Sequence, residues 1–148
     1  MTISVRSGGL GDIEEMYALD CASFEFPWTL NDFKSVLLSG TPVILIEEKG
    51  KIVAQCVYRT VLDEAEILTL AVAPDARGKG YARLLLEELD AILFALGVRY
   101  LFLEVRVSNT RARHVYSSAG FEEIGFRKRY YLTRDGREDA VVMQKALM

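Results

Sequence analysis

The sequence has few of the residues that cross-link small proteins or bind metals. Its two cysteines, Cys21 and Cys56, lie far apart and outside any CxxC arrangement, and His114 is the only histidine. This pattern favours two free, buried thiols over a disulfide. One histidine argues against a histidine-based triad or metal cluster, so we expect no metal site and a helix-surface position for His114.

Long apolar runs and runs of one charge are also missing. No apolar stretch approaches the ~20 residues that cross a bilayer. The N-terminal MTISVRSGGLGD lacks the basic-then-apolar pattern of a signal peptide. The formal net charge of −3 is spread along the chain, without the basic stripe of a nucleic-acid binder. We therefore expect a cytoplasmic protein with no membrane partner and no direct nucleic-acid partner.

The composition is that of one folded domain. Apolar residues make up 51% and charged residues 26% of 148 residues, the balance of an ordinary globular protein. The sequence has no internal repeat and no Pro- or Ser-rich linker. We expect a single domain over residues 1–148.

Hydrophobic periodicity predicts the order β-α-α-β-β-β-α-β-α-β-β, a mixed α/β fold whose largely antiparallel sheet is flanked by helices. The predicted strands are 3–6, Val43–Glu48, Ile52–Val61, Glu66–Val72, Tyr100–Val105, Phe121–Tyr131 and about Glu138–Ala146. The predicted helices are 11–24, Thr29–Leu38 with a capping box of Thr29 and Asp32, Tyr81–Leu96, and one from Ser108-Asn109 to Gly120. The expected apolar faces are Ile13, Met16, Tyr17, Cys21 and Phe24 on the first helix, and Leu85, Leu89, Ile92 and Leu96 on the third.

A glycine-rich turn separates the strand that ends at Val72 from the helix that begins at Tyr81. Amides at a helix N-terminus are unpaired and lie at the positive end of the helix dipole, so they bind anions. The turn adds two glycines that let the backbone approach an anion, a small residue that keeps the first helical turn open, and two cations. These are Gly78 and Gly80, Ala82, and Arg77 and Lys79. The pattern predicts a pyrophosphate cradle.

Two common nucleotide loops do not match this turn. Tyr81 follows Gly80 where a Walker loop needs Lys-Ser/Thr, and Arg83 replaces the third glycine of the dinucleotide motif. A charged surface turn that binds nothing is the alternative interpretation. The strand before the turn and the helix after it favour the cradle.

The segment Arg77-x-x-Gly80-x-Ala82 resembles the Q/R-x-x-G-x-G/A signature of the GNAT superfamily, the Gcn5-related N-acetyltransferases. The order of strands and helices is similar too. Within the superfamily, the chain most resembles the RimI-type ribosomal-protein alanine N-acetyltransferases. The matching segments are Phe26–Thr29, Val61–Ala65, Leu103–Arg106 with Ser108-Asn109, Val115-Tyr116 with Gly120-Phe121, Tyr130-Tyr131, and Asp135–Ala140.

The resemblance implies acetyl-coenzyme A as co-substrate. The strand before the loop would pair with the pantetheine arm, the loop would bind the pyrophosphate, and Asn109 would touch the coenzyme. The implied coenzyme residues are Leu70, Ala71, Val72, Arg77, Gly78, Lys79, Gly80, Tyr81, Ala82, Arg83 and Asn109. From the residues alone, Leu70–Val72 is a buried strand and Asn109 is a helix N-cap.

Glu104 and Tyr116 are the candidates for acid–base chemistry. An amine that attacks a thioester needs a proton acceptor, and the departing thiolate needs a proton. Glu104 lies in an apolar strand, where burial makes a carboxylate a stronger base, but an ion pair with Arg106 or another cation is the alternative. Tyr116 follows Asn109 by seven residues on one helix face, and a core tyrosine is its alternative. The resemblance implies that Glu104 accepts a proton and Tyr116 donates one.

Two aromatic segments, Phe26-Pro27-Trp28 and Tyr130-Tyr131, are expected to form the walls of a peptide slot, with ordinary packing as the alternative. Three carboxylates, Glu64, Glu138 and Asp139, either contact a basic peptide or lie on a solvated face.

The sequence thus predicts an enzyme that acetylates the N-terminal α-amine of a protein. By resemblance, the substrate is the alanine of ribosomal protein number eighteen of the small subunit. A small-amine or lysine acetyltransferase and a non-catalytic acetyl-coenzyme A sensor are the alternatives. Tyr130-Tyr131 and Asp135–Ala140 favour the first, and a sensor needs neither Glu104 nor Tyr116.

Overall fold

The computed structural model describes residues 2–147, and its elements follow the predicted order. The strands are β1 (Ile3–Ser7), β2 (Val43–Glu48), β3 (Lys51–Val61), β4 (Glu64–Val72), β5 (Tyr100–Arg106), β6 (Glu122–Thr133) and β7 (Gly136–Ala146). The helices are α1 (Ile13–Ser23), α2 (Leu30–Leu38), α3 (Tyr81–Ala95) and α4 (Thr110–Ser118), with short 3-10 helices at Leu10–Asp12 and Pro74–Ala76. No helix within residues 2–147 has the length and apolarity that a membrane span requires.

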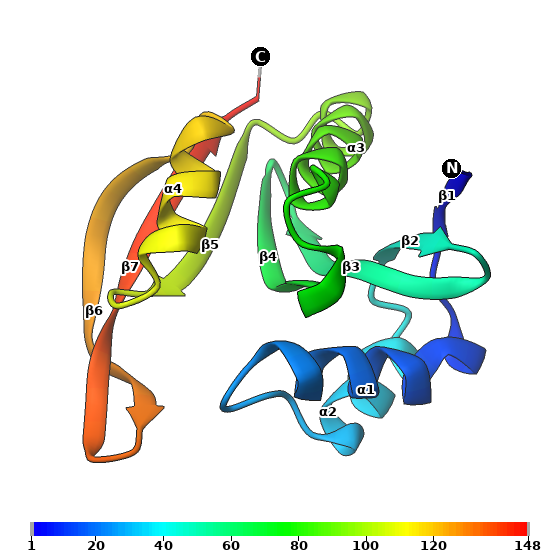
Figure 1. The fold of residues 1–148 in the computed structure, drawn as a ribbon. Coiled ribbons are helices and arrows are strands. Elements are labelled where there is room, and N and C mark those ends of the chain that lie inside the picture. Colours follow the sequence, from blue (N-terminus) through cyan, green and yellow to red (C-terminus); the bar gives the residue numbers. More distant parts are fainter. Residues whose placement is uncertain (1, 148) are drawn as a thin grey trace. The chain divides into compact units, whose positions relative to one another are not determined.

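The strands form a seven-stranded sheet in the hydrogen-bonded order β1-β2-β3-β4-β5-β7-β6 (Figure 1). Strand pairs β1–β2, β2–β3, β5–β7 and β6–β7 are antiparallel, and β4–β5 is parallel. A parallel pair needs a crossover connection, and α3 supplies it. The predicted mixed, largely antiparallel fold is confirmed.

Contacts divide the chain into two compact units. The first contains the chain up to Arg59 together with Leu68–Leu89, and the second contains Thr60–Ile67 and the chain from Asp90 onward. In the first unit, α1 and α2 lie side by side (Figure 1). In the second, α4 lies along the strands β5, β7 and β6 (Figure 1).

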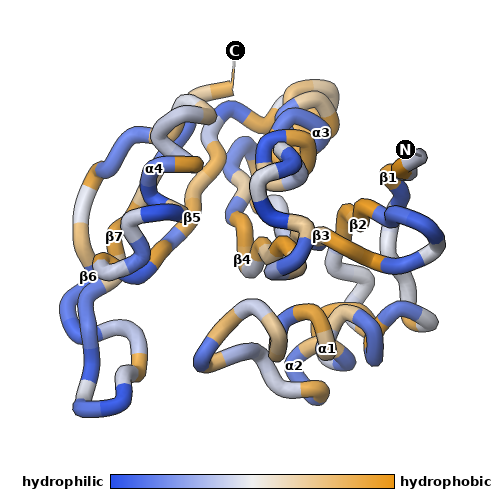
Figure 2. Tube along the Cα trace, in the orientation of Figure 1, coloured by the Kyte–Doolittle hydropathy of each residue, from blue (hydrophilic) through white to orange (hydrophobic). Residues whose placement is uncertain are grey.

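Buried apolar strands form the core of the first unit. Residues 43–46 of β2 and 52–58 of β3 are all buried. Figure 2 shows these strands as predominantly hydrophobic and the β6–β7 turn as predominantly hydrophilic. Near-continuous apolar runs of this kind are typical of strands that are covered on both faces.

The buried faces of two helices differ from the prediction. On α3 the buried stripe is Leu85, Leu86, Leu89 and Leu93, whereas Ile92 and Leu96 are 36% and 65% exposed. On α1 the buried residues are Met16, Leu19 and Asp20. The buried face of α3 includes Leu86 and Leu93, which the prediction left out. The buried face of α1 includes the carboxylate of Asp20, so it too is rotated from the expected face.

The cysteines are both free, as predicted, but only one of them is buried. Cys56 is buried and Cys21 is exposed, because the buried face of α1 passes through Met16, Leu19 and Asp20 instead. Burial raises the pKa of the Cys56 thiol to about 12. A buried thiol with a raised pKa is inert toward thiol reagents.

We therefore expect a thiol reagent at pH 8 to modify one cysteine per native chain and both in denaturant. A Cys21→Ser variant should lose the native reaction. Rapid modification of both thiols in the native protein would contradict this assignment, and chromogenic titration measures it directly.

Candidate active site

The glycine loop leads into the start of α3 in the first unit. Gly78 and Gly80 both have φ of +82°, a left-handed conformation that costs other residues about 1–2 kcal/mol. Apart from chain neighbours, no atom of residues 2–147 lies within 4 Å of the place where either glycine would carry a Cβ. The amide of Leu84 donates to the carbonyl of Gly80 at 3.0 Å, so the amides of residues 81–83 have no acceptor within the helix. Donors beside open space fit a pyrophosphate.

One cation of the loop is ion-paired with a carboxylate at the end of β2. Lys79 Nζ lies 3.3 Å from a carboxylate oxygen of Glu48, and the Tyr81 hydroxyl donates to the same carboxylate. The bond from Tyr81 holds the pKa of Glu48 below its usual value. Lys79 thus ties the loop to the end of β2. Arg77 and Arg83 are exposed and lie on either side of the two glycines in the sequence.

A buried carboxylate fixes the turn between α1 and α2. Asp20 has no exposed surface, and its side chain accepts hydrogen bonds from the amide of Trp28 at 2.9 Å and from the hydroxyl of Thr69 at 3.4 Å. Burial raises the pKa of Asp20, and the bonds from Trp28, Thr69 and Gln55 offset part of the rise. Because Thr69 directly precedes Leu70, Asp20 joins the aromatic turn to the strand expected to meet the pantetheine arm.

The aromatic turn itself is partly packed and partly exposed. The rings of Trp28 and Phe33 lie 5.1 Å apart and tilted by 51°, so Trp28 packs on α2. Phe26 is 43% exposed. On β4, Ala71 is buried, and the carbonyl of Val72 accepts a hydrogen bond from the Ser23 hydroxyl at 3.4 Å.

In the second unit, Glu104 lies on the less buried face of β5. Leu101, Leu103 and Val105 alternate with it and are buried. Arg127 Nε lies 2.9 Å from Oε1 of Glu104, and the two side chains are 57% and 12% exposed. The guanidinium of Arg127 also lies 5.3 Å from the centroid of the Tyr130 ring. Glu104 is thus nearly buried and ion-paired with a side chain of β6.

A β-bulge presents these β6 side chains. The register of β6 on β7 shifts between Arg127 and Tyr131, so residues 128–130 together face Asp139. Arg129 has φ of +52°, and its amide donates to a carboxylate oxygen of Asp139 at 2.9 Å. Asp139 therefore stabilises the bulge and does not lie on a simple solvated face.

The two adjacent tyrosines pack edge to face, with ring centroids 5.0 Å apart. Burial, followed by the charge of Glu104, raises the pKa of Tyr130. Burial first, and the charge of Glu104 second, also raise the pKa of Tyr131 above its usual value. Both hydroxyls therefore stay protonated at neutral pH, and both can donate hydrogen bonds to a peptide backbone.

The segments 104–109 and 135–140 support each other. Arg106 Nη1 lies 3.1 Å from a carboxylate oxygen of Glu138, and its guanidinium lies 4.6 Å from the centroid of the Tyr131 ring. The Ser108 hydroxyl donates to the same carboxylate at 3.0 Å. Donors of the chain itself engage Glu138, so its role is to hold Arg106 beneath Tyr131.

Helix α4 carries the other two candidates. The side chain of Asn109 accepts from the amide of Ala112 at 3.1 Å, which confirms the N-cap. Tyr116 is 8% exposed, and its ring lies edge-on to Phe121 at 5.6 Å. Glu104 is thus grouped with Tyr130 and Tyr131, while Tyr116 packs on the segment that follows α4. His114 is exposed on α4, as predicted.

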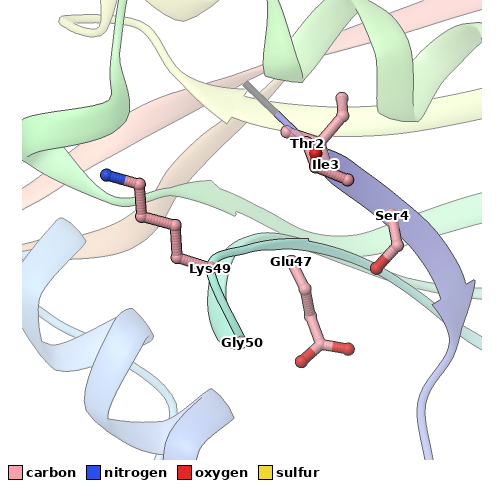
Figure 3. Close-up of a pocket in the computed structure, with 6 residues that line it drawn as sticks. All are labelled: Thr2, Ile3, Ser4, Glu47, Lys49 and Gly50. Atoms are coloured by element: carbon pink, nitrogen blue, oxygen red, sulfur yellow. The ribbon is translucent and has the colours of Figure 1, made fainter.

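A depression of about 430 Å³ lies at the β1–β2 edge, lined by Thr2, Ile3, Ser4, Glu47, Lys49 and Gly50. Figure 3 shows the side chains of Glu47 and Lys49 pointing in different directions, so its polar groups do not converge. Glu47 is also ion-paired with Arg6 at 2.5 Å. This depression has none of the features of a catalytic site.

The sequence profile of the acetyltransferase (GNAT) family matches residues 13–121. The ribosomal protein bS18-alanine N-acetyltransferase of Escherichia coli (strain K12) is 39% identical over 132 residues, which cover 89% of each chain. The enzyme of that name from Haemophilus ducreyi is 39% identical over 137 residues, covering 89% of this chain and 92% of that one. This chain belongs to the acetyltransferase (GNAT) family.

The structure agrees with that membership. The crystal structure of the ribosomal-protein-S18-alanine N-acetyltransferase from Escherichia coli matches this acetyltransferase with a TM-score of 0.93 and 36% identity. The match covers 99% of this chain and 94% of that one. The predicted fold and the predicted RimI-type resemblance are therefore confirmed.

Sequence reasoning missed three polar residues of this acetyltransferase. Asp20 lies four residues after Met16 on the buried face of α1. This helical spacing could have indicated that Asp20 is buried. Arg127 and Glu66 gave no local signal, yet Arg127 contacts Glu104 and the charge of Glu66 acts on Tyr130. Within residues 2–147 no group of three His, Cys, Asp or Glu side chains is arranged to hold a metal ion.

Proposed function

We propose that this acetyltransferase moves the acetyl group of acetyl-coenzyme A to the N-terminal α-amine of a protein, and that its natural substrate is the alanine of ribosomal protein bS18. The 39% identity to enzymes named for that reaction supports the substrate. The single observation that carries the proposal is the grouping of Glu104 with Tyr130 and Tyr131 around Arg127, which is ion-paired with Glu104 and lies 5.3 Å from the Tyr130 ring centroid. It sets a nearly buried base beside two hydroxyl donors that suit a peptide terminus.

In this proposal the whole chain acts as one acetyltransferase domain in the cytoplasm, where ribosomal proteins are made. The amides and the exposed cations of residues 77–83 bind the pyrophosphate, and Asn109 contacts the coenzyme beside its capping role. The backbone of Leu70–Val72 pairs with the pantetheine arm as an added strand would. Its amides polarise the thioester carbonyl. Acetyl-coenzyme A supplies the activated acyl group.

The remaining chemistry belongs to Glu104 and Tyr116. The amine nitrogen forms a bond to the thioester carbon, and the proton that it loses passes to Glu104. The carbon–sulfur bond breaks, and the thiolate takes a proton from Tyr116. A free α-amine has a pKa of about 7.7–8.0, so a modest base suffices near neutral pH.

The two aromatic segments are proposed, from the sequence resemblance, as the peptide-binding residues. Tyr130 and Tyr131 donate to the peptide backbone, and Phe26-Pro27-Trp28 limits the space for the first side chain. An Ala-initiated peptide should react well, its N-formylated form not at all, and an internal lysine very poorly.

Initial rates with Ala-, Ser- and Met-initiated peptides and with an N-blocked lysine peptide test this selectivity. A clear preference for the Ala terminus supports the proposal. Faster reaction of the lysine peptide or of free polyamines would overturn it in favour of a lysine or small-amine acetyltransferase. Coenzyme binding with no transfer to any of these would favour a sensor.

A further inference from the structure

The cation beside Glu104 reaches it across an intervening strand. In the register of the second unit, Arg127 on β6 pairs with Ala140 on β7, which in turn pairs with Arg106 on β5. Arg127 thus starts two strands away from β5, roughly 10 Å at the usual strand spacing. Only the small, fully buried Ala140 separates the two arginines along this row. The Arg127 side chain therefore extends across β7 and brings its guanidinium to Glu104.

The charges around Glu104 make this placement consequential. Glu66 of β4 is in register with Phe102 of β5, two residues before Glu104, so both carboxylates lie on the same face of the sheet. Arg106 of β5 is paired with Glu138 of β7. The positive charge of Arg127 therefore offsets the charge of Glu104, which would otherwise attract a cation.

Free α-amines and lysine side chains differ sharply in the fraction that is neutral near physiological pH. At pH 7.5, about a third of free α-amines are neutral, whereas only about 0.1% of lysine side chains are. Only the neutral form has the lone pair that attacks a thioester. An unopposed carboxylate would attract the ammonium form of either amine and fill the site with molecules that cannot react.

We propose that Arg127 is a specificity-determining residue that excludes ammonium ions from Glu104 and so admits neutral α-amines in preference to charged lysine or polyamine nitrogens. This inference rests on the proposed function and deepens it. Arg127 acts through Glu104 and positions its carboxylate, and it takes no part in proton transfer. Because its side chain is 57% exposed, solvent screens the charge and the expected effect is moderate.

A peptide with a permanent positive charge tests whether Arg127 excludes cations, because its binding can be measured without acetyl transfer. The probe is an Ala-initiated peptide whose α-nitrogen is trimethylated, so it mimics the ammonium form and cannot be acetylated. Its inhibition constant is measured against the unmodified peptide for the wild-type enzyme and for Arg127→Gln, Arg127→Met, Arg127→Lys and Lys128→Gln. Lys128 is an exposed neighbour on the same bulge, so its loss controls for net charge alone.

We expect Arg127→Gln and Arg127→Met to bind the trimethylated peptide about fivefold more tightly than the wild type. Arg127→Lys and Lys128→Gln should stay within about twofold of it, and the gain should shrink in high salt. The preference for α-amine over lysine peptides should fall in the same two variants.

Equal inhibition of the wild type and both neutral variants would overturn the inference, as would an equal gain in Lys128→Gln. A different result would show that the proposed function itself is wrong. In that case the wild-type enzyme itself would leave the unmodified Ala peptide unacetylated.

Discussion

Replacing Gly80 by Asp should lower the affinity for coenzyme A by about a hundredfold or more. Asp would take a left-handed conformation at φ of +82°, which costs about 1–2 kcal/mol. It would also set a negative charge in the open space before the first amides of α3, where the pyrophosphate is expected. Isothermal titration calorimetry with coenzyme A measures the loss.

Gly97 offers a matched control for this change. It lies just after α3, also has a positive φ, +80°, and also has open space around its missing Cβ. Gly97→Asp therefore introduces the same strain and charge away from the loop, and it should keep its coenzyme affinity. Undiminished affinity in Gly80→Asp would rule out this placement of the pyrophosphate.

The second large effect is expected at Glu104. Glu104→Gln should lower kcat by about a hundredfold or more and leave coenzyme binding largely intact, because the amide keeps the shape of the carboxylate but cannot accept the proton of the amine. Steady-state kinetics on an Ala-initiated peptide, together with calorimetry, separates the two quantities. Tyr116→Phe should behave in the same way if that hydroxyl protonates the thiolate. Normal turnover in Tyr116→Phe would remove it from the mechanism.

Glu123 provides the control for Glu104. It is also an ion-paired carboxylate of the sheet, 2.9 Å from Arg113, but it is in register with Met143 and, through Met143, with the buried Leu103. It therefore projects from the opposite face to Glu104. Glu123→Gln should turn over normally, and an equal loss in both variants would mean that the effect at Glu104 is structural.

Local features of this acetyltransferase could be predicted from the sequence because short-range chemistry determines them. Thr29 and Asp32 form the predicted capping box, with bonds of 2.8 and 3.1 Å between residues three apart. Gly78 and Gly80 lie in the predicted turn between a strand and a helix, and both adopt a positive φ there. Asn109 caps α4 as expected.

Long-range polar contacts could not be predicted, because they depend on strand register. The ion pair of Arg127 with Glu104 requires the strand order β5-β7-β6 and a bulge, neither of which leaves a periodic signal. The hydrogen-bond partners of Asp20 could not be predicted for a related reason. A buried carboxylate is stable only with partners, and Trp28 and Thr69 come from elsewhere in the chain.

Long-range contacts also connect the segment Asp135–Ala140 with the Tyr130-Tyr131 pair. Glu138 and Asp139 belong to a segment that matched known enzymes, and the sequence left open whether they meet a substrate or solvent. In the structure they hold Arg106 and the amide of Arg129, which sets the position of Tyr130-Tyr131. Their role is to support the aromatic pair.

The most direct measurement locates the acetyl group on the intact substrate. Ribosomal protein bS18 with a free N-terminal alanine is incubated with acetyl-coenzyme A and the wild-type enzyme, with Glu104→Gln as the inactive control, and is mapped by tandem mass spectrometry. We predict a single acetyl group on the alanine α-amine, formed by the wild type and nearly absent with Glu104→Gln. Acetylation mainly on lysine side chains, or equal labelling by both enzymes, would contradict the N-terminal acetyltransferase function.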